Sequence, residues 1–210
     1  MKTFLTTIKT FIFIIAVSSI QLDCVSNTGN IHIASQLKQP FMTGLDVLLE
    51  NDCLYLKGKK VGLITNQTGV TSKMMQNIDA FTKSENVDLK AIFSPEHGLF
   101  GSASAGEKIY NKIDSIYGIP LFSLYGNNKK PNKDMLKNLD ILVFDIQDIG
   151  IRSYTYISTM GLAMEAAQER GLEFMVLDRP NPLGLKKIEG NILSLSFKSF
   201  IGMYPIPYVH

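Results

Sequence analysis

The chain has 210 residues, of which 45% are hydrophobic and 19% charged, a composition typical of a globular domain with a core of its own. Its formal net charge is +2, and no run of more than two basic residues occurs. Composition and charge therefore give no support to a nucleic acid as partner.

The first 23 residues have the pattern of a secretory signal peptide. A lysine-bearing start is followed by the apolar run FIFIIAV at Phe11–Val17 and by a small-x-small cleavage site at Ala16–Ser18. The run is too short to span a bilayer, which takes about 20 apolar residues. We therefore expect an exported protein of the periplasm or cell envelope, with Cys24 as a candidate lipid anchor and residues 24–43 as a linker.

Predicted strands and helices alternate along the rest of the chain. Helical spacing and capping residues predict helices after Gly44, from Ser72 to about Lys83, from Asn132 to about Leu139, and over Ile157–Ala167 with Gly171 closing the last one. Apolar runs without alternation predict five strands that are covered on both faces, namely Lys59–Thr65, Leu89–Phe93, Ile119–Gly126, Leu139–Ile146 and Leu172–Asp178. This order predicts an α/β fold with a doubly wound, mostly parallel sheet.

Four of the predicted strands end in polar residues. In such sheets ligands bind at the carboxyl ends of the strands, and amides, carboxylates, tyrosines and an arginine on one rim suit a sugar or polyol. The candidate substrate-binding residues are Asn66, Gln67, Gln147, Arg152, Tyr154, Tyr156, Asp178, Arg179 and Asn181. Structural roles remain open beside this hypothesis: Asn66 and Asp178 as turn residues, and Arg152 as the ion-pair partner of Asp145, which lies inside an apolar strand.

The sequence SPEHG at Ser94–Gly98 places Glu96 beside His97 after a predicted strand. A glutamate in a partly closed pocket can donate a proton near neutral pH, and glycosidic cleavage needs such an acid and usually a second carboxylate. We predict that Glu96 is the general acid, that His97 tunes or positions it, and that the second carboxylate is one of Asp145, Asp148 and Asp178.

The chain has no sequence signature of a cofactor or metal site. No G-x-G-x-x-G follows a strand, and no Walker-type phosphate loop occurs, so we expect no nucleotide cofactor. The three histidines are scattered, and neither C-x-x-C nor H-E-x-x-H is present, so we expect no metal. Of the two cysteines, Cys53 is expected to be free or buried.

Six motifs occur in a characteristic order: TNQTG at Thr65–Gly69, SPEHG at Ser94–Gly98, AGEK at Ala105–Lys108, SLYG at Ser123–Gly126, DIQDIGIRSYTY at Asp145–Tyr156 and DRPNP at Asp178–Pro182. Over about residues 41–210 the chain resembles the DUF1343 family, whose characterised members are exo-β-N-acetylmuramidases of the NamZ type. The resemblance implies a Rossmann-like catalytic domain, here residues 44–190, with an active cleft between it and a smaller second domain. It also implies release of N-acetylmuramic acid from non-reducing ends of peptidoglycan fragments, with Glu96 as the catalytic acid and muramyl saccharides as the partners.

The chain departs from the family pattern in two places. Phe100 and Ser102 stand where family members often carry an arginine and an aspartate, and a basic group there could bind the lactyl carboxylate. Family proteins continue beyond PIPYVH, so residues 191–210 are expected to begin a C-terminal region that is largely absent. The alternatives to a muramidase are a non-catalytic module that binds muramyl sugars and, less favoured because the phosphate loop is missing, a nucleotide-dependent enzyme.

Overall fold

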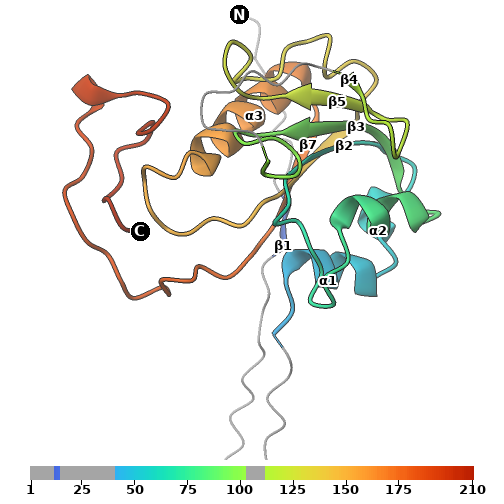
Figure 1. The fold of residues 1–210 in the computed structure, drawn as a ribbon, viewed down its shortest axis with the longest axis horizontal. Coiled ribbons are helices and arrows are strands. Elements are labelled where there is room, and N and C mark those ends of the chain that lie inside the picture. The colour runs from blue at the N-terminus through green and yellow to red at the C-terminus, as the bar shows by residue number, and fades with distance from the viewer. Residues whose placement is uncertain (1–11, 15–40, 103–111) are drawn as a thin grey trace, which may run out of the picture.

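The computed structural model describes residues 12–14, 41–102 and 112–210 (Figure 1). The expected signal peptide, the linker and Cys24 therefore lie outside the described residues, apart from the short stretches 12–14 and 41–43, and so does the AGEK motif. No helix in the described part of the chain is both long and apolar enough to cross a membrane.

A seven-stranded sheet forms the centre of the domain, in the order β1-β7-β6-β2-β3-β5-β4. Five central strands run parallel, namely β2 (Lys60–Thr65), β3 (Asp88–Ser94), β5 (Pro120–Ser123), β6 (Ile141–Asp145) and β7 (Glu173–Leu177). The two edges are β1 (Ile12–Ile14), parallel to β7, and the short β4 (Lys112–Ile113), antiparallel to β5. The predicted α/β fold with a mostly parallel sheet is confirmed.

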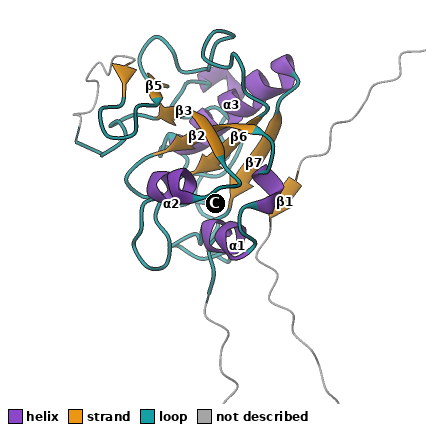
Figure 2. Ribbon diagram, turned by 90° about the vertical axis from the view of Figure 1, so that its right-hand side faces the viewer, coloured by secondary structure: helices purple, strands orange, loops and turns teal. Residues whose placement is uncertain are grey.

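Helices cover both faces of this sheet (Figures 1 and 2). The helices α1 (Gly44–Glu50) and α2 (Asn77–Lys83) pack on one face, where Leu45, Leu48 and Phe81 are fully buried. The longer α3 (Tyr156–Arg170) packs on the other face. Short 3₁₀ turns at Leu54–Leu56 and Leu195–Phe197 complete the regular structure. Burial on both faces explains the unbroken apolar runs, since every residue of β6 is buried.

Two predicted helices are wrong in part or in whole. The helix expected from Ser72 begins only at Asn77, because Met74 has left-handed backbone (φ 63°) in a preceding turn and is 75% exposed. No helix forms at residues 132–139, which make a series of turns. The Asn132 side-chain oxygen does accept hydrogen bonds from the Asp134 and Met135 amides, as a helix N-cap would. The backbone bonds from Lys137 and Leu139 then reach back only three residues, and Asn138 has left-handed backbone (φ 63°), so no continuous helix follows.

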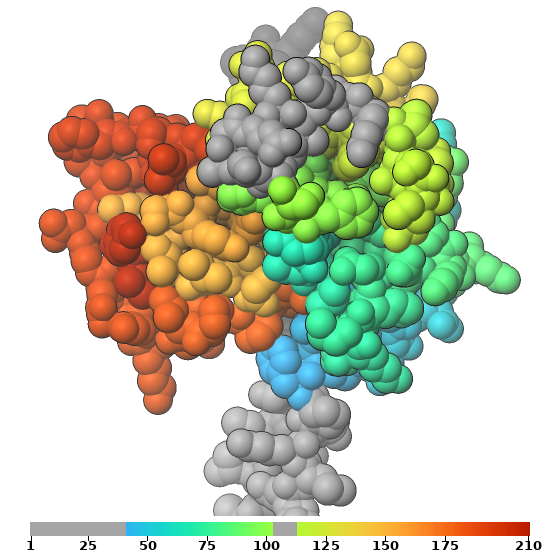
Figure 3. Space-filling model, viewed as in Figure 1, coloured from blue at the N-terminus to red at the C-terminus, as the bar shows by residue number. Residues whose placement is uncertain are grey.

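The last part of the chain runs over the surface with little regular structure. Residues 183–210 lie beside α3 and form the left side of the molecule in Figure 3, in orange to red. Backbone bridges join Val209 to Ile151 and Glu189, and His210 donates its amide to the Gly150 carbonyl at 2.9 Å. The loop after β6 therefore anchors the C-terminal segment.

Candidate active site

The carboxyl edge of the sheet carries a row of buried polar residues. The last residues of four adjacent strands are polar and at most 3% exposed: Asp145 of β6, Thr65 of β2, Ser94 of β3 and Ser123 of β5. Thr65 pairs with Asp145, and Ser94 pairs with Ser123, in the parallel register. The sheet thus changes from apolar to polar at the edge where ligands bind in such folds.

Asp145 is fully buried and fully paired. Its carboxylate accepts two hydrogen bonds from the Arg179 guanidinium, at 2.7 and 3.1 Å, and a third from the Asn77 side-chain amide at 2.7 Å. Burial raises the pKa of Asp145, while Arg179 and Asn77 oppose that shift. The expectation that Arg152 pairs with Asp145 is wrong. Arg179 takes that place because it follows β7, the strand next to β6.

Glu96 sits on a tight turn directly after β3. The Gly98 amide donates to the Pro95 carbonyl at 3.1 Å, and His97 between them has left-handed backbone with φ 70°. Few non-glycine residues adopt this conformation, and such strained backbone tends to occur at functional sites. Glu96 and His97 are each half-buried, so the turn presents them at the rim of the sheet.

Side chains from two other segments surround Glu96. The Thr155 hydroxyl, at the start of α3, donates to Glu96 Oε2 at 3.3 Å. Burial and the neighbouring Tyr154 raise the pKa of Tyr156 to about 12, and the charge of Glu96 adds a smaller contribution. The Tyr154 and Tyr156 rings meet edge to face with centroids 4.6 Å apart. Among the described residues, the buried Asn66 Nδ2 interacts electrostatically with Tyr156 but makes no hydrogen bond of good geometry.

The loops after β2 and β6 are joined to each other beside this group. Asn66 Oδ1 accepts from the Thr68 amide and hydroxyl, and the Thr68 hydroxyl accepts from the Gln147 amide at 2.9 Å. The Gln147 side chain donates to the carbonyl of Pro180 at 2.8 Å. Asp148 Oδ1 accepts from two amides of its own loop. The exposed Gln67 lies next to Gly101, where a Cβ atom would be 2.6 Å from its Nε2.

Arg152 and Asn181 are engaged with the C-terminal segment. Arg152 donates to the carbonyls of Asn191 and Ile206, at 2.7 and 2.6 Å, and its guanidinium lies over the Tyr208 ring. The Asn181 amide donates to the His210 carbonyl at 2.9 Å. Both side chains thus hold residues 191–210 against the domain.

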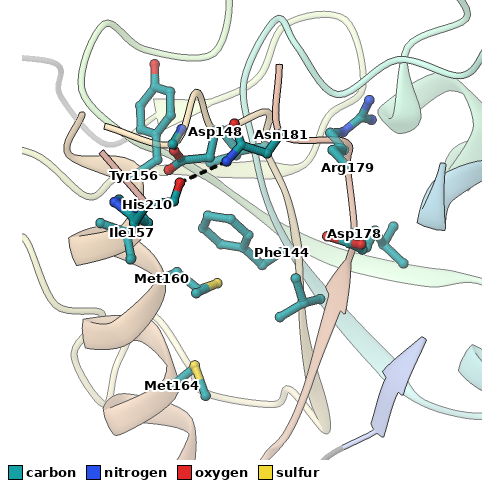
Figure 4. A pocket seen from close by; sticks show the side chains of 14 residues that line it. Phe144, Asp148, Tyr156, Ile157, Met160, Met164, Asp178, Arg179, Asn181 and His210 are labelled. Atoms are coloured by element: carbon teal, nitrogen blue, oxygen red, sulfur yellow. Dashed lines mark hydrogen bonds between the residues drawn. The ribbon is translucent and has the colours of Figure 1, made fainter. Parts of the chain in front are cut away.

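A cavity of about 310 Å³ opens between α3 and the ends of β6 and β7 (Figure 4). Its deeper wall is apolar, with Phe144, Met160 and Met164, and its rim is polar, with residues Asp148, Tyr156, Asp178, Arg179, Asn181 and His210. Tyr156 lies both on this rim and in the group around Glu96. The exposed Asp178 holds α1 through its backbone carbonyl, which accepts from the Gly44 amide.

In the described residues, no three His, Cys, Asp or Glu side chains are grouped closely enough to hold a metal ion. Cys53 is a buried free thiol, as expected, and burial raises its pKa.

The geometry brings together part of the predicted site and adds residues to it. Glu96, Tyr154, Tyr156 and Asn66 form one group, whereas Asp145 with Arg179, and Arg152 with Asn181, belong to separate contacts. Thr155 and Asn77 were not among the predicted residues. Thr155 lies inside the motif DIQDIGIRSYTY, and this motif could have indicated it.

Fold and site together define an α/β domain with a mostly parallel sheet, in which the loop after β3 presents Glu96 at the carboxyl edge. The model of the exo-β-N-acetylmuramidase NamZ family, N-terminal region, matches residues 61–210, and the chain belongs to this family. The peptidoglycan β-N-acetylmuramidase NamZ of Bacillus subtilis is 52% identical over 173 residues, which are 82% of this chain and 42% of that protein.

Two solved structures of DUF1343 family proteins from Bacteroides fragilis have the same fold. One is 51% identical with a TM-score of 0.74, and the match covers 80% of this chain and 42% of the other. The second is 37% identical with a TM-score of 0.67, and the match covers 80% of this chain and 43% of the other. The chain therefore spans less than half the length of these relatives.

Proposed function

We propose that this chain is the acid-bearing part of an exo-acting glycosidase that releases N-acetylmuramic acid from the non-reducing ends of peptidoglycan fragments. One observation carries the proposal: Glu96 is presented at the carboxyl edge on a strained turn, with Thr155 and the Tyr154–Tyr156 pair beside it. The B. subtilis relative named for this activity supports the substrate class.

In the proposed reaction, Glu96 donates a proton to the oxygen of the glycosidic bond as that bond breaks, and a water molecule supplies the hydroxyl group that the anomeric carbon of N-acetylmuramic acid gains. The half-buried Tyr154 supplies an aromatic surface against which a sugar ring can pack. Because Asp145 is occupied by Arg179 and Asn77, the second carboxylate is left to Asp148 or Asp178. Of these two, Asp148 is the half-buried one and lies in the loop that is bonded to Thr68.

We further propose that the protein acts outside the cytoplasm, in the periplasm or cell envelope. The amino-terminal pattern of a basic start, an apolar run and a small-residue site supports export, and Cys24 is the residue that a lipid would modify. A substrate derived from the cell wall suits this location. The fate of Cys24 can be read from the mass of the mature protein.

The function is tested by incubating the chain with the disaccharide in which N-acetylmuramic acid is β-linked to N-acetylglucosamine, and by following the release of free N-acetylmuramic acid. We expect release from this disaccharide and none from the matched disaccharide of two N-acetylglucosamine units, which lacks the lactyl group. Calorimetric binding of N-acetylmuramic acid without release would favour the muramyl-sugar binding module, provided that release is also not restored when the family's second domain is added. If the chain neither binds N-acetylmuramic acid nor releases it, both functions are contradicted.

A further inference from the structure

Thr155 stands at the N-cap of α3, but its hydroxyl does not cap the helix. At this position a threonine usually accepts a hydrogen bond from an amide of the first turn. Here no such side-chain bond forms, and the hydroxyl donates instead to Glu96 Oε2 at 3.3 Å. The helix start thus gives up a common stabilising contact, and the hydroxyl is directed to the predicted catalytic acid.

The backbone of Thr155 is firmly held, so its hydroxyl is a fixed donor. Its carbonyl accepts from the amides of Ser158 and Thr159, at 3.0 and 3.1 Å, and from the Thr159 hydroxyl at 3.4 Å. On the other side, Glu96 is carried by the turn that Gly98 closes onto Pro95. A donor on a 15-residue helix and an acceptor on a closed turn therefore meet with little freedom on either side.

From this geometry we infer that Thr155 is a positioning residue that sets which oxygen of Glu96 carries the acidic proton. An oxygen that accepts the Thr155 hydrogen bond is the carbonyl oxygen of the protonated carboxyl group, so the proton resides on Oε1. Oε1 is then the atom that faces the glycosidic oxygen. After proton transfer the same hydroxyl donates to the carboxylate that is formed, and hydrogen bonds to charged groups are the stronger ones.

This role rests on the proposed function of Glu96 and is distinct from a role of Thr155 in helix stability. The test uses Thr155→Val, which keeps the shape but removes the hydroxyl, and Thr155→Ser, which keeps the hydroxyl. On the muramyl disaccharide we expect Thr155→Val to lower kcat by about 10-fold or more with KM within about twofold, because a hydrogen bond to a charged group is lost. Thr155→Ser should restore most of kcat.

A second substrate separates positioning of the acid from general damage. An aryl N-acetylmuramide with a good leaving group, such as dinitrophenol, needs no proton from Glu96. On it we expect Thr155→Val to stay within about threefold of the parent. An equal loss on both substrates, with the same loss in Thr155→Ser, would overturn the inference and assign Thr155 to structure alone.

Crystal structures of the two variants decide the matter even if no substrate is turned over. We expect the Glu96 carboxylate to rotate or to occupy several positions in Thr155→Val and to keep its place in Thr155→Ser. An unmoved carboxylate in Thr155→Val would overturn the inference whether or not the chain is a muramidase. If the parent shows no turnover but the Glu96 carboxylate moves in Thr155→Val, the proposed function is rejected. Thr155 still positions the carboxylate in that case.

Discussion

Asp145 and Arg179 form a buried ion pair that ties the end of β6 to the loop after β7. The Arg179 side chain is 6% exposed and the Asp145 side chain is not exposed at all, and the two groups make a bidentate contact at 2.7 and 3.1 Å. Arg179 also donates to the Val70 carbonyl at 3.0 Å, so the pair joins three of the loops at the carboxyl edge. We regard it as the scaffold that holds this edge together.

Arg179→Met is expected to lower the free energy of unfolding by about 3–5 kcal/mol, because it leaves the buried Asp145 carboxylate without its countercharge. Urea unfolding of the two proteins measures the difference. The matched control is Lys90→Met, which removes the exposed pair of Lys90 with Asp88 and should cost less than about 1 kcal/mol. An Arg179→Met variant as stable as this control would contradict the scaffold role.

Gly44→Ala should destabilise the protein although alanine is the better helix former. Gly44 begins α1 against the end of β7, where an added Cβ atom would lie 2.4 Å from the Asp178 amide nitrogen and 2.8 Å from Leu177 Cα. Both neighbours are backbone atoms, so the helix itself must shift. We expect a lower thermal midpoint, whereas Glu50→Ala at the exposed end of the same helix should change it little. A midpoint unchanged by Gly44→Ala would show that α1 is loosely docked.

The sheet could be predicted from the sequence because its strands are unbroken apolar runs. β2 and β6 are buried on both faces, and their predicted bounds differ from the structure by a few residues. The carboxyl edge followed from the same pattern, since polar residues come directly after each run. The turns at residues 132–139 could not be predicted in this way, because Asn132 caps the segment as it would cap a helix and only the left-handed backbone of Asn138 shows that no continuous helix follows.

Contacts between distant segments were the harder part of the site to predict. The sequence suggests Arg152, seven residues away, as the partner of Asp145, whereas strand order brings Arg179 next to it. Thr155 becomes part of the site only through its hydrogen bond to Glu96, which is 59 residues away in the sequence. Such partners depend on the order of strands in the sheet, which an apolar run does not reveal.

Asp46 should stabilise the folded protein near neutral pH and lose this stabilising effect in acid. Burial alone would raise the pKa of Asp46, but hydrogen bonds from Ser72 and from Thr43, its capping-box partner, lower it below the ordinary value of 3.8. Because the folded pKa lies below the unfolded one, this stabilisation is present above about pH 4 and is lost as pH falls through the folded pKa. The free energies of unfolding of the parent and of Asp46→Asn should therefore differ at pH 6, and the difference should shrink as the pH falls below about 4. A gap that widens in acid would contradict this account.

Arg152 is the arginine that we expect to recognise the lactyl carboxylate. Arg179 is sequestered by Asp145, whereas Arg152 is half-buried and donates to Asn191 and Ile206 through Nη1. A bidentate contact between an arginine and a carboxylate is stronger than a neutral hydrogen bond. Arg152→Ala should thus weaken binding of N-acetylmuramic acid more than that of N-acetylglucosamine, as calorimetry would show. Because Arg152 also holds Asn191 and Ile206, folding of the variant is checked first. An unchanged preference between the two sugars would remove Arg152 from this role.

The most direct measurement is the turnover of the muramyl disaccharide by Glu96→Gln, compared with the parent and with Glu85→Gln, which changes an exposed glutamate in the loop after α2. General acid catalysis contributes about 10²–10⁴-fold. We expect Glu96→Gln to lose at least about 100-fold in kcat with its fold and most of its sugar affinity intact, His97→Ala to lose less, and Glu85→Gln to match the parent. The loss in Glu96→Gln should shrink on an activated aryl glycoside. Turnover of the disaccharide by Glu96→Gln within a few-fold of the parent would contradict the account and move the search for the acid to Asp148 and Asp178.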